Sequence, residues 1–204
     1  MHKPTILPAM VLSGLLVVGC QGPQGNAAGN GSMMQTSANE AIPGGNPPMS
    51  QANSASPMAV PAPTDAPTYI AKAGAGDLFE IESSRAVLGK SKNAKVTEFA
   101  KMMIKQHQDS TAKVKAAAAK AKLTVPAPIL LPDQQAMLDQ IKTADAASVD
   151  TVYLRHQQTA HEAALALHQG YAETGDTPAL NAAAAEIATV VKTHIGHLAD
   201  MQAR

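Results

Sequence analysis

The chain has 204 residues and a formal net charge of +0 at pH 7, because 16 basic side chains balance 16 acidic ones. This balance excludes a strong overall attraction to nucleic acid or to an anionic membrane surface, so we expect no nucleic-acid partner. Hydrophobic residues make up 45% of the sequence and aromatic residues only 2%, so a core must be built from Ala, Leu, Ile, Val and Met, which favours an all-α fold over a sheet.

Residues 1–19 have the pattern of a bacterial lipoprotein signal peptide. Lys3 gives a positive start, ILPAMVLSGLLVV is a short apolar segment, and VVGC places Gly19 directly before Cys20, the single cysteine of the chain. The apolar segment is shorter than the about 20 residues that a spanning helix needs. We therefore expect Cys20 to be lipidated and to anchor the mature chain in a membrane. The alternatives are an uncleaved signal anchor and a lone buried cysteine.

The residue after the cysteine bears on which membrane holds the anchor. By resemblance to lipoprotein sorting rules, retention in the inner membrane typically needs Asp at this position, and here it is Gln21. We therefore expect an outer-membrane lipoprotein that faces the periplasm. The sequence indicates no particular protein partner.

Residues 20–67 follow as a segment of low complexity. After Cys20 it is dominated by Gly, Pro, Ser, Asn, Gln and Ala, and Glu40 and Asp65 are its only charged residues. Such a composition cannot bury enough apolar area to offset the entropy of the chain. We expect a disordered tether between the lipid anchor and a folded domain at residues 68–204.

The folded domain is predicted to start with two long helices. The first covers residues 68–89, and the second covers residues 94–123 with Asn93 as its N-cap. On the first helix, the residues expected to face inward form two adjoining stripes. One stripe is Leu78, Ile81, Arg85 and Leu88, and the other is Phe79, Glu82 and Ala86. The stripe of the second helix is apolar except near its middle, where it carries His107 and Ser110.

Three further helices are predicted after the prolines at 126, 128 and 132. A short one covers residues 134–143 with Asp133 as its cap, and a long one starts at Ser148 and stops at Gly175. Thr177 and Pro178 begin the last helix. The stripe of the long helix includes His161 and His168, and that of the last helix includes His194 with His197 beside it. Four long amphipathic helices and one short one predict an antiparallel four-helix bundle with an extra short helix.

Each long helix therefore carries a side chain that can bind metal on or near its apolar stripe. These candidate ligands are Glu82, His107, His161, His197 and His194. Bundles build metal sites in this way, from side chains that facing helices direct to a common interior point. The alternative is a set of core imidazoles that carbonyls, amides or water satisfy without a metal. His156 lies off the stripe and is expected to be a surface residue.

Several blocks of the sequence resemble one known family. LFEIESSRAVLGKSKNAKVTEFAKMMIKQHQDS, VDTVYLRHQQTAHEAALAL and THIGHLADM are similar, in order and spacing, to blocks of the domain-of-unknown-function 4142 family of bacterial envelope proteins. The resemblance covers roughly residues 69–203 and implies a ferritin-like helical bundle. Its signature positions correspond here to Glu82, Phe99, Ala100, His107, Asp150, Tyr153, His161, His197 and Leu198.

The ferritin-like label does not extend to a di-iron centre. Such centres use a Glu-x-x-His pair on each of two helices. Here Ile104 stands three residues before His107, His194 stands three before His197, and Val191 stands three before His194, so the glutamates are lacking. One carboxylate with three or four imidazoles suits a single Zn, Fe, Ni or Cu ion.

We expect a non-enzymatic envelope lipoprotein whose bundle is a periplasmic binding or stress-protection module, with or without one metal ion at the Glu/His centre. No complete catalytic motif is present, so no catalytic residue is assigned. Two alternatives stay open. One is a metal-dependent, oxidase-like enzyme at the same centre, and the other is a metal-free structural bundle.

Overall fold

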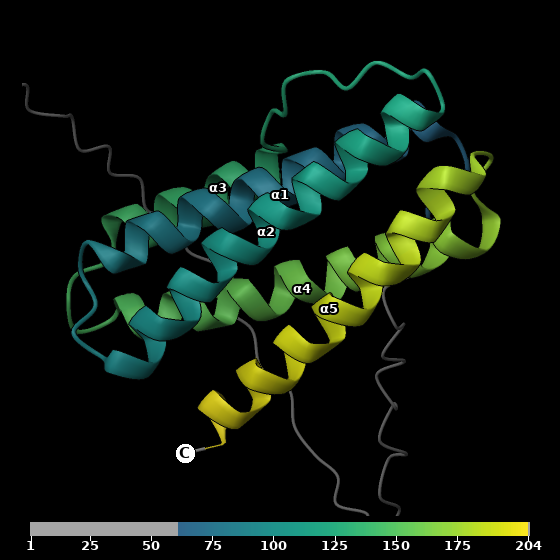
Figure 1. Ribbon diagram of the computed structural model, residues 1–204. Helices are drawn as coiled ribbons and strands as arrows, with labels where there is room; N and C mark the ends of the chain where they lie inside the picture. Colours follow the sequence, from purple (N-terminus) through teal and green to yellow (C-terminus); the bar gives the residue numbers. More distant parts are fainter. Residues whose placement is uncertain (1–60, 204) are drawn as a thin grey trace, which may run out of the picture. The chain divides into compact units, whose positions relative to one another are not determined.

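The computed structural model describes residues 61–203, which form five α-helices and no strand (Figure 1). The helices are α1 (Ala66–Leu88), α2 (Ala94–Lys120), α3 (Pro132–Thr143), α4 (Val149–Thr174) and α5 (Pro178–Gln202). The predicted all-α class is confirmed. The signal peptide at 1–19, Cys20 and most of the expected tether lie outside the described residues. Within residues 61–203, no helix has both the length and the apolar character that crossing a bilayer requires.

Local sequence signals explain where most helices begin and end. The Asp65 side chain accepts a hydrogen bond from the backbone N–H of Thr68, so α1 starts slightly before the predicted boundary. Asn93 caps α2 as predicted, because its side chain accepts from the N–H of Lys95. Gly175 ends α4, where a Cβ atom would lie only 2.6 Å from the carbonyl oxygen of Tyr171.

The predicted cap of the short helix was wrong. Leu131 is the N-cap of α3 and Pro132 is its first residue, so Asp133 lies in the first turn and not at the cap. Proline fits this first position because its ring fixes φ and its missing N–H would have no helical partner. The side chain of Gln134, in the first turn, accepts from the backbone N–H of the cap residue Leu131.

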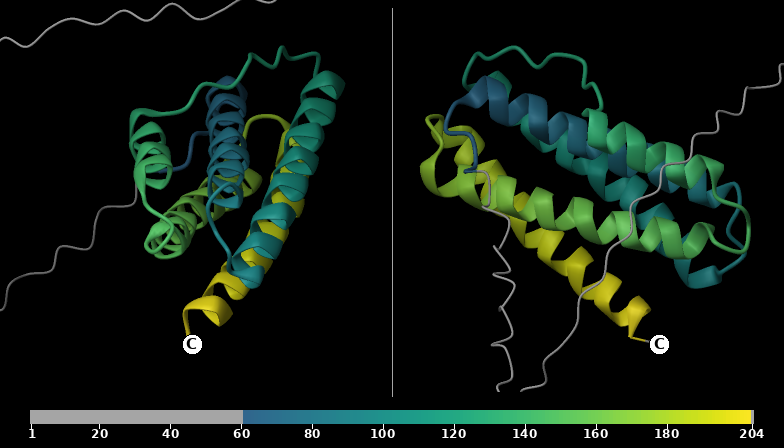
Figure 2. Two further views of the ribbon diagram at one scale, coloured as in Figure 1. Left: turned by 90° about the vertical axis from the view of Figure 1, so that its left-hand side faces the viewer. Right: turned by 180° about the vertical axis from the view of Figure 1, so that it is seen from behind.

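Helix α1 is the most enclosed element of the fold. It packs against α2, α3 and α4, and it lies between α2 and α3 in Figure 2. The segment between α2 and α3 passes close to α1, since a Cβ atom on Gly74 would lie 3.3 Å from the Cβ of Pro128. Helix α5 packs against α4 and α2. The interior positions of α1 therefore face several partners at once.

The two expected inward stripes of α1 were wrong except at Phe79, which is fully buried. Leu78, Ile81 and Leu88 are only half-buried and Arg85 is exposed, whereas the buried face includes several polar residues. Those buried polar residues are Asp77, Glu80, Ser83 and Ser84. Apolar periodicity failed here because a helix enclosed on several sides buries small and polar side chains that find partners on its neighbours.

The apolar core is divided into two parts. One contains Tyr69, Val114, Tyr171, Leu180 and Val191 together with neighbouring small residues. The other is centred on aromatic and aliphatic residues nearer the opposite end of the helices, among them Phe79, Val96, Phe99, Met103, Tyr153 and Leu198. Asp77 on α1, His107 on α2, His161 on α4 and His194 on α5 are buried polar residues that lie between these two groups along their helices. A polar layer therefore crosses the middle of the structure.

Candidate metal centre

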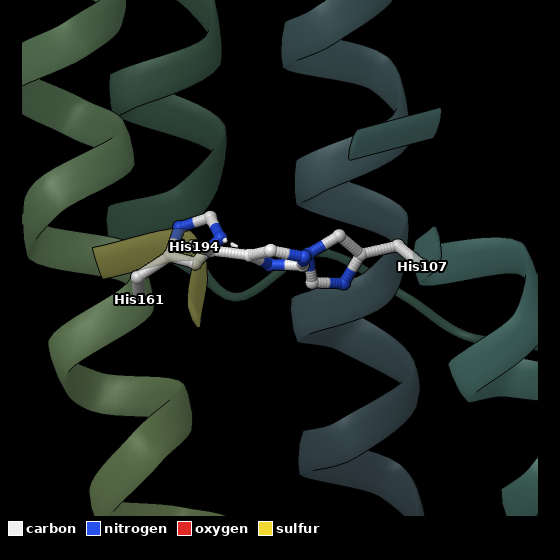
Figure 3. A group of neighbouring side chains, drawn as sticks. All are labelled: His107, His161 and His194. Carbon is white, nitrogen blue, oxygen red and sulfur yellow. Dashed lines mark hydrogen bonds between the residues drawn. The ribbon is translucent and has the colours of Figure 1, made fainter. Parts of the chain in front are cut away.

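Three histidines meet in this polar layer. His107 on α2, His161 on α4 and His194 on α5 point toward one another (Figure 3), and one ring nitrogen from each lies within 4.8 Å of the others. Their exposed fractions are 4%, 0% and 1%. The ring centroids are 5.6 Å apart for His107 and His161, 5.6 Å for His107 and His194, and 5.2 Å for His161 and His194. Such a buried group of imidazoles needs either mutual hydrogen bonds or a shared ion.

The outer nitrogen of His107 is held by a carboxylate. Its Nδ1 lies 2.9 Å from Oδ1 of Asp77, whose Oδ2 accepts a 2.8 Å hydrogen bond from the hydroxyl of Thr111. A carboxylate can only accept, so Nδ1 carries the proton. Nε2 is buried and has no hydrogen-bond partner among residues 61–203. The lone pair on Nε2 is thus free to bind a ligand.

The negative charges of Asp77 and Glu80 near His107 also favour a positive charge on or next to its ring. Burial lowers the pKa of His107, but the hydrogen bond to Asp77 and the charges of Glu80 and Asp77 offset this and raise the pKa above its ordinary value. The same groups that stabilise an imidazolium would stabilise a metal-bound imidazole.

His161 and His194 are oriented in a matching way. Nδ1 of His161 lies 2.8 Å from the backbone oxygen of Gln157 and 3.3 Å from Oε1 of Glu80, and both of these atoms are acceptors. Nε2 of His194 donates to the side-chain oxygen of Gln106. Each ring therefore uses its N–H on an outer acceptor, and the nitrogen left without a proton faces inward.

The two inward nitrogens face each other. Nε2 of His161 and Nδ1 of His194 are 3.1 Å apart, and with the outer nitrogens protonated both present a lone pair. Burial lowers the pKa of His161, and burial with the charges of His161, His107 and His197 lowers the pKa of His194 to about 3. Both rings are therefore neutral near pH 7, and either a shared proton or a metal ion between the two nitrogens would relieve the repulsion of the facing lone pairs.

The spacing fits a transition-metal ion. Imidazole nitrogens bind zinc at about 2.0–2.1 Å, so two ligands at a tetrahedral angle lie roughly 3.3 Å apart. The observed 3.1 Å between His161 and His194 is close to this value. His107 completes the set after a small movement, since the widest separation in the group is within 4.8 Å. The residues present therefore fit a bound metal ion.

Two of the residues expected at this centre lie elsewhere. The Glu82 side chain is 35% exposed and pairs with Arg85 at 2.7 Å on the surface of α1, as the rotation of that helix requires. His197 is exposed and lines a separate surface pocket with Phe99 and Met201. His194 and His197 are three residues apart on α5, and it is His194 that faces inward.

The other two histidines of α4 are both buried. His156 was expected at the surface, but this was wrong: its Nε2 lies 2.9 Å from the side-chain oxygen of Gln140 on α3. Helix α3 covers the side of α4 that carries His156, and the sequence pattern of α4 did not predict this contact. His168 lies toward the other end of the bundle, where its Nδ1 is 3.0 Å from the hydroxyl of Tyr69. Neither belongs to the group of three.

Sequence reasoning missed the residues that orient the three rings. These are Asp77, Glu80, Gln106 and the backbone of Gln157. One signal was available on α1, because Asp77, Glu80 and Ser84 are spaced by three and four residues and so share a helix face. The carboxylate of this region is therefore supplied by Asp77 and Glu80, which lie behind the rings, and not by Glu82.

Comparison with known proteins places the chain among helical domains without an assigned activity. A family model described as a domain of unknown function (DUF4142) matches residues 49–201, which confirms the resemblance found in the sequence. A crystal structure of a DUF305 fragment from Deinococcus radiodurans aligns with a TM-score of 0.59 at 14% identity, covering 70% of this chain and 97% of that one. A DUF305 protein from Streptomyces coelicolor aligns with a TM-score of 0.57 at 16% identity, covering 68% and 91%. No curated protein matches the chain. At these identities, the likeness to the two crystal structures concerns the fold.

Proposed function

Since the chain belongs to the DUF4142 family, whose description assigns no activity, we propose from its own residues that the domain binds one transition-metal ion through His107, His161 and His194. The observation that carries this proposal is the 3.1 Å approach of Nε2 of His161 and Nδ1 of His194, on two rings whose other nitrogens each face an oxygen acceptor. A buried pair of facing lone pairs is unfavourable unless a cation lies between them.

The identity of the ligands narrows the class of metal. Three neutral imidazoles suit Zn, Fe, Ni or Cu and do not suit the hard ions Mg and Ca, which prefer oxygen. Asp77 and the other outer acceptors would fix the orientation of the rings and raise their basicity. The polar layer then serves as a binding centre within a ferritin-like bundle of four antiparallel long helices, with α3 as the extra helix.

The metal site is proposed to work as a non-enzymatic binding or stress-protection module. This role is supported by the side chains that contact the three rings, since Asp77, Glu80 and Gln106 act as orienting acceptors. The role of a metal-dependent, oxidase-like enzyme is the alternative, and it would need a substrate in addition to the ion.

Metal analysis of the full chain, purified without a histidine tag, tests the proposal. We expect one tightly bound ion per chain after loading, and loss of that ion in His107→Ala and His161→Gln, because each removes one of three ligands. His197→Ala is the matched control, since this exposed residue lies three positions from His194 and outside the centre. Circular dichroism checks that each variant folds.

A protein that stays free of metal after loading, while remaining folded, would contradict the proposal. In that case the three histidines and their acceptors form a hydrogen-bonded network without an ion. Loss of metal in His197→Ala as well would mean that the ion binds at a surface site that includes His197.

We also propose that the domain is carried by a lipoprotein anchor in the outer membrane and faces the periplasm. The support is the sequence pattern around Cys20. Cys20→Ala is expected to release the protein from the membrane fraction into the soluble fraction when cells are fractionated, while the unmodified chain stays with the membrane. A Cys20→Ala protein that still sediments with the membrane would contradict lipidation at this residue.

A further inference from the structure

A groove between α2 and α5 leads from the surface to the histidine centre. It has a volume of about 270 Å³, and both His107 and His194 line it. Ile187, Val190 and Val191 form its apolar wall on α5. Since a water molecule in the liquid occupies about 30 Å³, the groove has room for small molecules next to the rings.

Two buried polar atoms in this groove lack partners. The hydroxyl of Ser110 and Nε2 of His107 have no hydrogen-bond partner in the part of the chain that the structure describes. The Ser110 residue is only 7% exposed and lies one helical turn after His107 on the same face of α2. Leaving a buried hydroxyl without a partner is unfavourable, because no hydrogen bond offsets the loss of its contacts with water. Because Ser110 lines the same groove as His107 and His194, a molecule bound in the groove at the centre is the natural partner for this hydroxyl.

Residues 61–203 supply three ligands to this centre. Among residues 61–203, the group of mutually close donor atoms contains three imidazoles and no carboxylate oxygen. Glu80 reaches the outer nitrogen of His161 at 3.3 Å, on the side of the ring away from the centre. Zinc sites with three protein ligands characteristically hold a water or an exogenous ligand as the fourth.

We infer that the metal ion at this centre takes an exchangeable fourth ligand, a water, a hydroxide or a small anion, which enters through the α2–α5 groove and is hydrogen-bonded by Ser110. This inference rests on the proposed metal site. The net charge at the mouth of the groove is small, because Lys105 is paired with Asp109 at 2.7 Å and Lys113 is paired with Glu186. The attraction for an anion therefore comes from the ion.

Cobalt substitution with azide as the probe tests this inference. The full chain is loaded with Co(II), whose visible absorption reports its ligands, and is then titrated with azide. We expect a saturable change in the Co(II) spectrum as azide enters the fourth position. Ser110→Ala should weaken azide binding about three- to tenfold, as expected for one lost hydrogen bond, while Co(II) still binds.

A second variant tests the route. Val190 is exposed and lines the groove, so Val190→Trp should narrow it and weaken or slow azide binding without loss of Co(II). Thr189→Trp is the matched control, because Thr189 is exposed on the same helix and does not line the groove.

The outcomes separate the two proposals. If Co(II) binds and azide leaves its spectrum unchanged at all concentrations, the exchangeable position is refuted and the metal site stands. If azide binds equally well to the unmodified protein, Ser110→Ala and Val190→Trp, the ligand does not use this groove, and the inference is refuted as well. If Co(II) does not bind to the folded chain, the metal site and the inference built on it fail together.

Discussion

Asp77→Asn is expected to weaken metal binding about ten- to hundredfold without unfolding the domain. The carboxylate of Asp77 accepts from Nδ1 of His107 at 2.9 Å and from Thr111 at 2.8 Å. Asparagine has the same shape, so its oxygen can still accept from His107 and its amide can donate to the Thr111 hydroxyl. What the substitution removes is the negative charge behind the ligand ring.

The loss of that charge should appear in affinity because a carboxylate behind a metal-bound imidazole raises the basicity of the imidazole. Competition with a chromophoric chelator measures the affinity, and thermal unfolding of the metal-free protein shows whether the fold is intact. Asp109→Asn is the matched control, since it removes an exposed carboxylate of the same helix that pairs with Lys105. Equal affinities in Asp77→Asn and the unmodified chain would show that His107 does not bind the ion through Nε2.

Acidification from pH 7 to pH 4 is expected to destabilise the metal-free domain, with His168 alone contributing about 3 kcal/mol. Burial lowers the pKa of His168 from 6.5 to about 4, and the charge of His107 adds to this while that of Asp77 opposes it. The ring is enclosed by Tyr69, whose hydroxyl lies 3.0 Å from Nδ1, and Tyr69 stacks on Tyr171 at a centroid distance of 3.9 Å.

The sign follows from the two protonation states. Between pH 6.5 and pH 4, the unfolded chain binds a proton at His168 and the folded chain does not. Acid therefore favours the unfolded chain over this interval. The stability contributed by the neutral ring is complete above pH 6.5, is lost as the pH falls toward 4, and does not fall further below the folded-state pKa.

Denaturant unfolding at several pH values, with a chelator present, checks this expectation. His168→Gln keeps an acceptor for the Tyr69 hydroxyl but cannot titrate, so its stability should fall less steeply between pH 6.5 and pH 4. His197→Gln is the control, because that ring is exposed in the folded chain. Parallel curves for His168→Gln and the unmodified protein would contradict the prediction.

The sequence predicted where the helices begin and end far better than it predicted which side of each helix is buried. Asn93, Gly175 and the Thr177–Pro178 pair mark helix ends through local chemistry that a sequence carries directly. His107, His161 and His194 were also found, because each interrupts an otherwise apolar stripe on a helix that is buried on one side. The family itself was recognised from the order and spacing of three blocks.

The position of the carboxylates could not be predicted in the same way. Helix α1 is enclosed by three other helices, so its buried face includes Asp77 and Glu80, which look like surface residues by polarity alone. Their burial is acceptable only because His107, Thr111 and His161 lie within reach, and those partners belong to other helices. The same reasoning applies to His156, which is buried because α3 folds over it. Partners far apart in sequence leave no periodic signal.

The three ligands come from three separate helices, and even the two that are nearest in sequence, His161 and His194, are 33 residues apart. An ion held by all three rings would join distant segments in the way a disulfide does, and cross-links that close long loops restrict the unfolded chain most. With a single cysteine, the chain cannot form an internal disulfide. The centre would therefore act as a removable cross-link within the bundle, one that a chelator opens.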